Sequence, residues 1–260
     1  MKMNRGKCLL VLTTAWILGS INVISAKGLP LSSQNDSSLQ AEVTSKALNK
    51  PKLQNVEASL HDGVVTLTGS VEVFNLKEEA DKRTHRIKGV KAVLNNIEVT
   101  NPDIPDSLLQ EKLVKAISYD RTSYGTTAFN AIAVTVRNGA VTLTGHAYRS
   151  IDADSAEAIT ANTPGVKDVV NKIEVDPLSP MDDRIRIQVF RSVYGFPSLN
   201  KYANDPEKPI RISVQSGNVT LYGAVDSQAD KDAANIRATG VPGVFTVTNK
   251  LQVAGTSPKE

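Results

Sequence analysis

Asp62-Gly63-Val64-Val65-Thr66-Leu67-Thr68-Gly69 recurs as Asn138-Gly139-Ala140-Val141-Thr142-Leu143-Thr144-Gly145 and as Ser216-Gly217-Asn218-Val219-Thr220-Leu221-Tyr222-Gly223. A second glycine follows the turn glycine after 26 residues in every copy (63 to 89, 139 to 165, 217 to 243) and is always followed by valine. Self-similarity at a fixed period is the signature of a repeat architecture. The sequence therefore predicts three copies of one structural unit.

Each copy has the same order of local patterns around this stretch. A helical spacing of apolar residues comes first, as in Ile185, Val189 and Val193, and a strand of period two follows, as in Ile210, Ile212 and Val214. The pair Asp-Gly, Asn-Gly or Ser-Gly then predicts a two-residue hairpin turn, because both of its positions need positive φ. The strand after the turn carries a glycine on its inward face, which indicates close approach of another backbone.

A second helix and a final strand complete the unit. Alanine stands nine residues before the closing glycine in all three copies, at Ala80, Ala156 and Ala234, where a small side chain permits close contact with a sheet. The last strands are expected over residues 90–99, 166–175 and 244–253, each parallel to the strand before its helix. The predicted class is α+β, with three tandem α-β-β-α-β domains, each a three-stranded mixed sheet packed against two helices.

These motifs resemble the BON domain, a module named for the osmotically inducible periplasmic protein Y and for nodulation proteins. The resemblance covers almost all of residues 39–254 in three copies. It implies a periplasmic or secreted location and association with phospholipid or envelope surfaces, with osmotic or envelope stress suggested by the family name. It implies no catalytic residues, because the matching glycines and aliphatic residues are structural.

The first 26 residues have the pattern of a secretory signal peptide. Lys2, Arg5 and Lys7 precede an apolar stretch from Cys8 to Leu18, and small residues end at Ser25-Ala26. An uncleaved anchor is the competing interpretation, weakened by Thr13, Thr14 and Asn22. We expect a signal peptide at 1–26 and domains at 27–102, 103–178 and 179–260, with Pro-rich joints between them.

Removal of this segment changes what the composition implies. The whole chain has a net charge of +3, and the segment carries all of that excess, so the remainder is neutral. A neutral chain does not favour nucleic acid as a partner. The only Cys and the only Trp also lie in the segment, which excludes disulfides and thiolate chemistry from residues 27–260. Cys8 precedes the apolar stretch, so a lipid anchor is not predicted.

Catalytic and metal motifs are missing from the sequence. His61, His85 and His146 lie on different elements without ligand spacing and are interpreted as surface histidines. Nucleophile-elbow, phosphate-loop and dinucleotide motifs do not occur. We predict a non-enzymatic protein with no cofactor, no metal site and no catalytic residue.

Aromatic residues gather where copies two and three differ most from copy one, between the first helix and the first strand. Insertions in repeats tend to lie on the binding face, and rings beside cations suit a membrane interface. The predicted lipid-binding residues are Phe190, Arg191, Tyr194, Phe196, Lys201, Tyr202, Tyr119, Arg121 and Tyr124. The alternative is that these rings close a small core over a long loop.

The predicted partner is an anionic phospholipid or envelope surface. Two other classes stay open: a soluble periplasmic protein-binding or chaperone-like stress protein that uses sheet edges or grooves, and a structural module of a larger envelope assembly.

Overall fold

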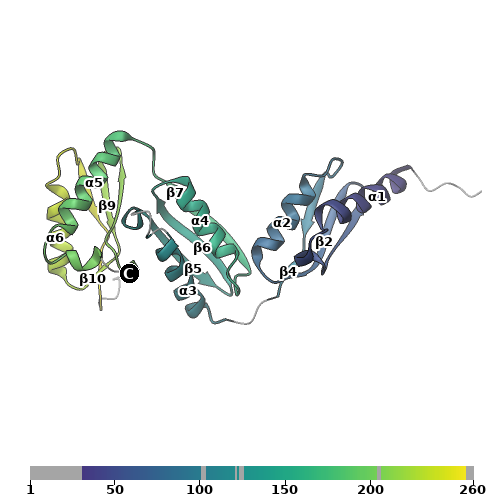
Figure 1. Cartoon of the computed structure of the whole chain (residues 1–260), viewed down its shortest axis with the longest axis horizontal. Coiled ribbons are helices and arrows are strands. Elements are labelled where there is room, and N and C mark those ends of the chain that lie inside the picture. The colour runs from purple at the N-terminus through teal and green to yellow at the C-terminus, as the bar shows by residue number, and fades with distance from the viewer. Residues whose placement is uncertain (1–30, 101–103, 121, 123–125, 204–205, 256–260) are drawn as a thin grey trace, which may run out of the picture.

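The computed structural model describes residues 31–100, 104–120, 122, 126–203 and 206–255. The predicted signal peptide lies outside these residues. Three similar α/β units follow one another along the long axis of the molecule (Figure 1).

The first unit consists of α1 (Leu31–Glu42), a π-helical turn (Val43–Ala47), a 3-10 turn (Pro51–Leu53), β1 (Val56–His61), β2 (Val64–Val71), α2 (Phe74–His85), β3 (Ala92–Asn95) and β4 (Glu98–Val99). The second consists of α3 (Asp106–Asp120), a 3-10 turn (Thr127–Phe129), β5 (Ala131–Arg137), β6 (Ala140–Ala147), α4 (Ser150–Ala161) and β7 (Asp168–Val175). The third consists of α5 (Pro180–Tyr194), a 3-10 turn (Asn200–Ala203), β8 (Arg211–Gln215), β9 (Asn218–Tyr222), β10 (Ala224–Val225), α6 (Gln228–Thr239), β11 (Thr246–Asn249) and β12 (Gln252–Val253).

The strand carrying the repeated motif is the central strand of each sheet. β2, β6 and β9 pair antiparallel with the strand before them and parallel with the strand after the second helix. The predicted α-β-β-α-β unit is therefore confirmed in all three copies.

Backbone geometry explains the two kinds of glycine in the motif. Asp62, Asn138 and Ser216 and the glycines after them all have positive φ, as a type I′ turn requires. A Cβ at Gly69 or Gly145 would lie 1.9 or 2.1 Å from a carbonyl oxygen at the start of the neighbouring strand, that of Asn55 just before β1 or that of Ala131 in β5. The glycine expected to permit close backbone approach does so against that strand.

The closing strand differs from its prediction in two copies. It is continuous as β7 in the second unit, but in the first and third units it breaks after Asn95 and Asn249. The side-chain oxygens of Asn95, Asn171 and Asn249 each accept the N–H of the residue two positions later. Each asparagine thus accepts a hydrogen bond from a backbone N–H group of the last strand that would otherwise lack an acceptor at the sheet edge.

Each sheet is covered on one face by its two helices, and the small alanines of the second helices are fully or almost fully buried. The second and third units share one apolar core, since Ala128 and Phe129 of unit two belong to the same buried cluster as α5 and β8. Unit one meets unit two through Phe74, which joins the core cluster around Leu109 and Leu113.

Candidate functional site

The predicted lipid-binding residues separate into a buried group and an exposed group. Tyr194 and Tyr202 are 4% and 5% exposed. The Tyr194 hydroxyl donates to the Ile210 carbonyl oxygen (2.6 Å), and the ring of Phe190 packs between Tyr194 and Phe129. Burial raises the pKa of Tyr194, so its hydroxyl stays a donor. Tyr194 and Tyr202 must be removed from the candidate lipid surface, because they form the small core that the alternative interpretation described.

Arg191, Phe196, Lys201 and Tyr119 lie at the surface, whereas Arg121 and Tyr124 fall outside the described residues. Lys201 is engaged within the protein, since its Nζ lies 2.8 Å from Asp226 and 3.0 Å from Asp230. The ring of Phe196 has the guanidinium of Arg237 over one face, 5.5 Å from its centroid. Of the predicted set in unit three, Arg191 is the residue most available to a ligand.

Arg191 belongs to an outward stripe of α5 that the sequence reasoning did not identify. The helix begins sharply, because Ser179 Oγ accepts the Asp182 N–H and Pro180 follows the cap. Ile185, Val189 and Val193 face the core. The opposite face exposes two apolar and two cationic side chains at helical spacing: Met181 (63%), Arg184, Ile187 (45%) and Arg191.

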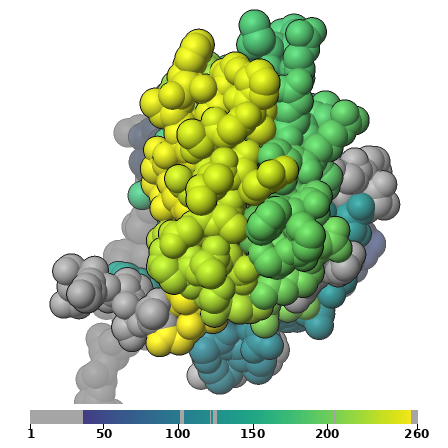
Figure 2. Space-filling view, turned by 90° about the vertical axis from the view of Figure 1, so that its left-hand side faces the viewer, coloured from purple at the N-terminus to yellow at the C-terminus, as the bar shows by residue number. Residues whose placement is uncertain are grey.

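The two arginines of this stripe lack ion-pair partners among the described residues. α5 and α6 cover one face of the sheet of unit three, at the end of the molecule away from unit one (Figure 1), and α5 also contacts unit two through Phe190 and Arg186. Seen from that end, α5 (green) and α6 (yellow-green) form much of the visible surface (Figure 2). The stripe is therefore a solvent-facing, amphipathic surface at one end of the molecule.

The corresponding helix of unit two, α3, presents a weaker version of this surface. Leu108 and Tyr119 are 56% and 47% exposed on it. Two lysines lie between them. Lys115 lies 3.7 Å from Glu207 of unit three, whereas exposed Lys112 follows Glu111 in the sequence. α3 thus offers apolar groups with less unpaired positive charge than α5.

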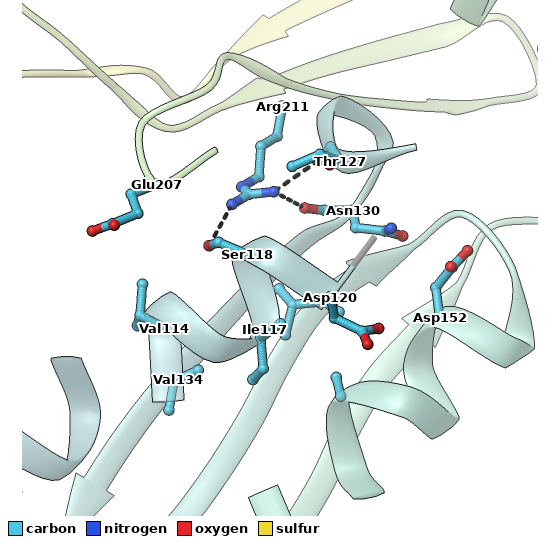
Figure 3. A pocket seen from close by; sticks show the side chains of 12 residues that line it. Val114, Ile117, Ser118, Asp120, Thr127, Asn130, Val134, Asp152, Glu207 and Arg211 are labelled. Carbon is cyan, nitrogen blue, oxygen red and sulfur yellow. Dashed lines mark hydrogen bonds between the residues drawn. The ribbon is translucent and has the colours of Figure 1, made fainter. Parts of the chain in front are cut away.

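Polar contacts fix the joint between units two and three. Arg211 Nη1 donates to the carbonyl oxygens of Thr127 and Asn130 (both 2.8 Å), and Nη2 donates to Ser118 Oγ (3.2 Å) (Figure 3). Burial lowers the pKa of Arg211. Because the guanidinium donates these hydrogen bonds inside the protein, Arg211 acts as a structural strut that connects unit three to unit two.

A cavity of about 200 Å³ lies beside this strut, between α3, α4 and β5 (Figure 3). Its apolar side is formed by Val114, Ile117, Ile132, Val134 and Ala156. Its three carboxylates already have partners: Asp120 accepts from Ser155, Asp152 from Arg149, and Glu207 pairs with Lys115. The lining therefore does not present a free charge to a ligand.

A second polar cluster at the joint centres on Asp176. This buried carboxylate accepts from Ser213 Oγ (3.1 Å) and Gln215 Nε2 (3.0 Å) and lies 3.4 Å from Arg186 Nη2. His146 Nδ1 lies 3.5 Å from Asp176 and 3.1 Å from Gln215. The surface interpretation thus holds for His61 and His85, whereas His146 is part-buried between two units.

The described residues contain no cluster of three or more His, Cys, Asp or Glu side chains that could hold a metal ion. Among the helices that the structure describes, none combines the length and apolar character needed to span a bilayer.

Comparison with known families identifies the repeated unit. The family model described as "BON domain" matches residues 35–101, 105–177 and 198–255, which is well over half of the chain. The chain belongs to the BON domain family. The third match begins after α5, yet α5 packs on the sheet of the third BON domain as α3 does on that of the second.

Three solved structures are distantly similar to this chain of BON domains. CdsD, a structural protein of the type III secretion system of Chlamydia trachomatis, is 17% identical over 84% of this chain and 91% of that one, with a TM-score of 0.24. A structure of the CdsD C-terminal domain is 14% identical over 82% and 96%, with a TM-score of 0.24. The periplasmic domain of PrgH, a type III secretion inner-membrane protein of S. typhimurium, is 11% identical over 81% and 98%, with a TM-score of 0.21. These values carry no conclusion about function, and no curated protein matches the sequence.

Proposed function

We propose that this protein is an exported, non-enzymatic envelope protein whose third BON domain binds anionic phospholipid through the outer face of α5. The observation that carries the proposal is the stripe in which Arg184 and Arg191, without ion-pair partners in the part of the chain that the structure describes, alternate with exposed Met181 and Ile187. Osmotic or envelope stress protection is the role that the family name suggests for such binding.

The chemistry of the stripe suits a bilayer surface better than a soluble anion. A basic residue near an anionic surface contributes about 1 kcal/mol, and apolar side chains between the cations can enter the headgroup region. A soluble anion would use the two arginines but would leave Met181 and Ile187 in water. α5 forms part of the surface at the free end of unit three, which leaves room for a flat partner (Figure 2).

Flotation with liposomes tests this proposal. Residues 27–260, the form expected after signal-peptide removal, should float with phosphatidylglycerol-containing vesicles at low salt and less at high salt, because exposed charges are screened. Zwitterionic vesicles should recover much less protein. The double variant Arg184→Glu/Arg191→Glu should lose at least tenfold in affinity for the anionic vesicles.

A matched control is available in unit one. Arg86 and Lys88 are also exposed cations, and Arg86→Glu/Lys88→Glu changes the net charge by the same amount. This control should retain most of the binding. Equal losses in both double variants would contradict the assignment to α5, and no flotation under any condition would contradict lipid binding and favour a protein partner.

A further inference from the structure

One position beside the hairpin turn differs between the third unit and the other two. Lys91, Lys167 and Phe245 occupy equivalent places, since each donates its backbone N–H to the carbonyl oxygen of the turn glycine at 2.8–2.9 Å. In units one and two the lysine side chain lies over that glycine. In unit three the phenyl ring lies against Gly217 and is 79% exposed.

The turn is fixed to the start of α5. Asp182, in the first turn of that helix, accepts the N–H groups of Ser216 and Gly217 at 2.9 and 2.8 Å. Phe245 therefore lies at the end of unit three where α5 begins, the end at which exposed Met181 starts the stripe. A large ring and a flexible apolar side chain thus mark the same end of the candidate surface.

Exposure of this ring is unfavourable in water, and the fold does not require it, because lysine fills the same place in two sister units. Aromatic rings gain free energy when they enter the interface of a bilayer, next to headgroups bound by arginine. A groove of a partner protein fits these observations less well, since the ring packs against a hairpin turn at the same end of unit three as the cationic stripe.

We infer that Phe245 inserts into the bilayer interface when α5 binds lipid, and that it fixes the orientation in which unit three lies on the membrane. This inference rests on the proposed function of α5 but goes further, because electrostatic binding by the arginines alone does not require insertion. It assigns the hairpin end of unit three to the deeper part of the contact.

A single indole reports this insertion directly. Residues 27–260 contain no Trp, so Phe245→Trp introduces the only one. Its emission should shift to shorter wavelength on addition of phosphatidylglycerol vesicles and should be quenched by lipids brominated on their acyl chains. Lys167→Trp places an indole at the equivalent turn of unit two and should show neither effect.

Replacement of the ring by the residue of the sister units separates insertion from electrostatics. Phe245→Lys should fold normally and bind anionic vesicles about tenfold more weakly, whereas a purely electrostatic contact would become stronger with the added cation. Two results would overturn the inference and leave the α5 proposal standing: flotation of the unmodified protein with no shift in the indole emission of Phe245→Trp, or tighter binding by Phe245→Lys. Absence of flotation by the unmodified protein would overturn both.

Discussion

At the scale of single residues, the repeated hairpin is stabilised by an aspartate from the first helix of its own unit. Asp106 accepts the N–H groups of Asn138 and Gly139 at 2.6 and 3.0 Å, as Asp182 does for the turn of unit three. In unit one Asp36 accepts the Asp62 N–H, at 2.8 Å. A two-residue turn leaves these donors outside the strand ladder, and a carboxylate satisfies them with charge-assisted bonds.

Asp182→Ala should therefore lower the free energy of unfolding by about 2–4 kcal/mol, because two hydrogen bonds to a buried carboxylate disappear and two N–H groups lose their acceptor. Urea unfolding followed by circular dichroism measures this loss. Asp36→Ala is the matched control and should cost less, since its bond to the turn lies at an exposed site. Equal costs would show that burial and the second bond contribute nothing.

At the scale of elements, the insertion of unit three is folded back onto the start of α6. The Tyr202 hydroxyl donates to Asp230 Oδ2 (2.8 Å) and accepts the Asp226 N–H (2.7 Å), while Lys201 lies beside both carboxylates. Burial alone would raise the pKa of Asp230, but hydrogen bonds from Tyr202, Lys201 and Ser227 outweigh it and lower that pKa. The hydrogen bond with Lys201 likewise lowers the pKa of Asp226.

This arrangement predicts acid sensitivity of unit three. A carboxyl with a depressed folded-state pKa adds stability above its unfolded value of about 4 and loses it as the pH falls through the folded-state pKa. Asp230→Asn should lower the thermal midpoint at pH 7 and flatten its decline below about pH 4. Asp232→Asn, on the exposed side of the same helix, should leave the pH profile unchanged. A profile unaltered by Asp230→Asn would contradict this account.

At the scale of the whole molecule, units two and three are joined by a shared core and two polar clusters. Arg211 is the strut of one cluster, and Asp176 with Arg186 forms the other, where the guanidinium also lies 4.6 Å from the ring centroid of Tyr148. Unfolding of one unit would expose the apolar surface and polar groups of the other. The two units should therefore unfold together.

Arg211→Met keeps an unbranched apolar side chain but removes every donor, so the carbonyl oxygens of Thr127 and Asn130 lose the bonds that Arg211 gives them. We expect the free energy of unfolding to fall by about 3 kcal/mol and the single calorimetric transition to split into two. Hydrogen exchange at residues 126–130 should quicken. Arg137→Met, an exposed arginine of β5, is the control and should leave the single transition intact. A single transition in Arg211→Met would contradict the role of the strut.

The candidate surface was only partly predictable from the sequence. Clustering of aromatics and cations indicated the same region of unit three, and Arg191 and Phe196 are exposed there. The same clustering included Tyr194 and Tyr202, because composition does not tell whether a ring faces solvent or closes a core. Met181, Arg184 and Ile187 were missed, although their spacing opposite Ile185 and Val189 in α5 was a usable signal.

The sequence alone determined the repeat, the order of elements, the hairpin turns and the parallel closing strand. These features follow from local rules, because positive φ at two turn residues, periods of 2 and 3.6, and short connections act within one unit. Tertiary structure alone decided how the units meet and which groups are left outside. Arg186 and Asp176 are charged residues, a class that is mostly exposed, yet they are buried, and Arg211 is partly buried, since each has hydrogen-bond or ion-pair partners distant in the chain.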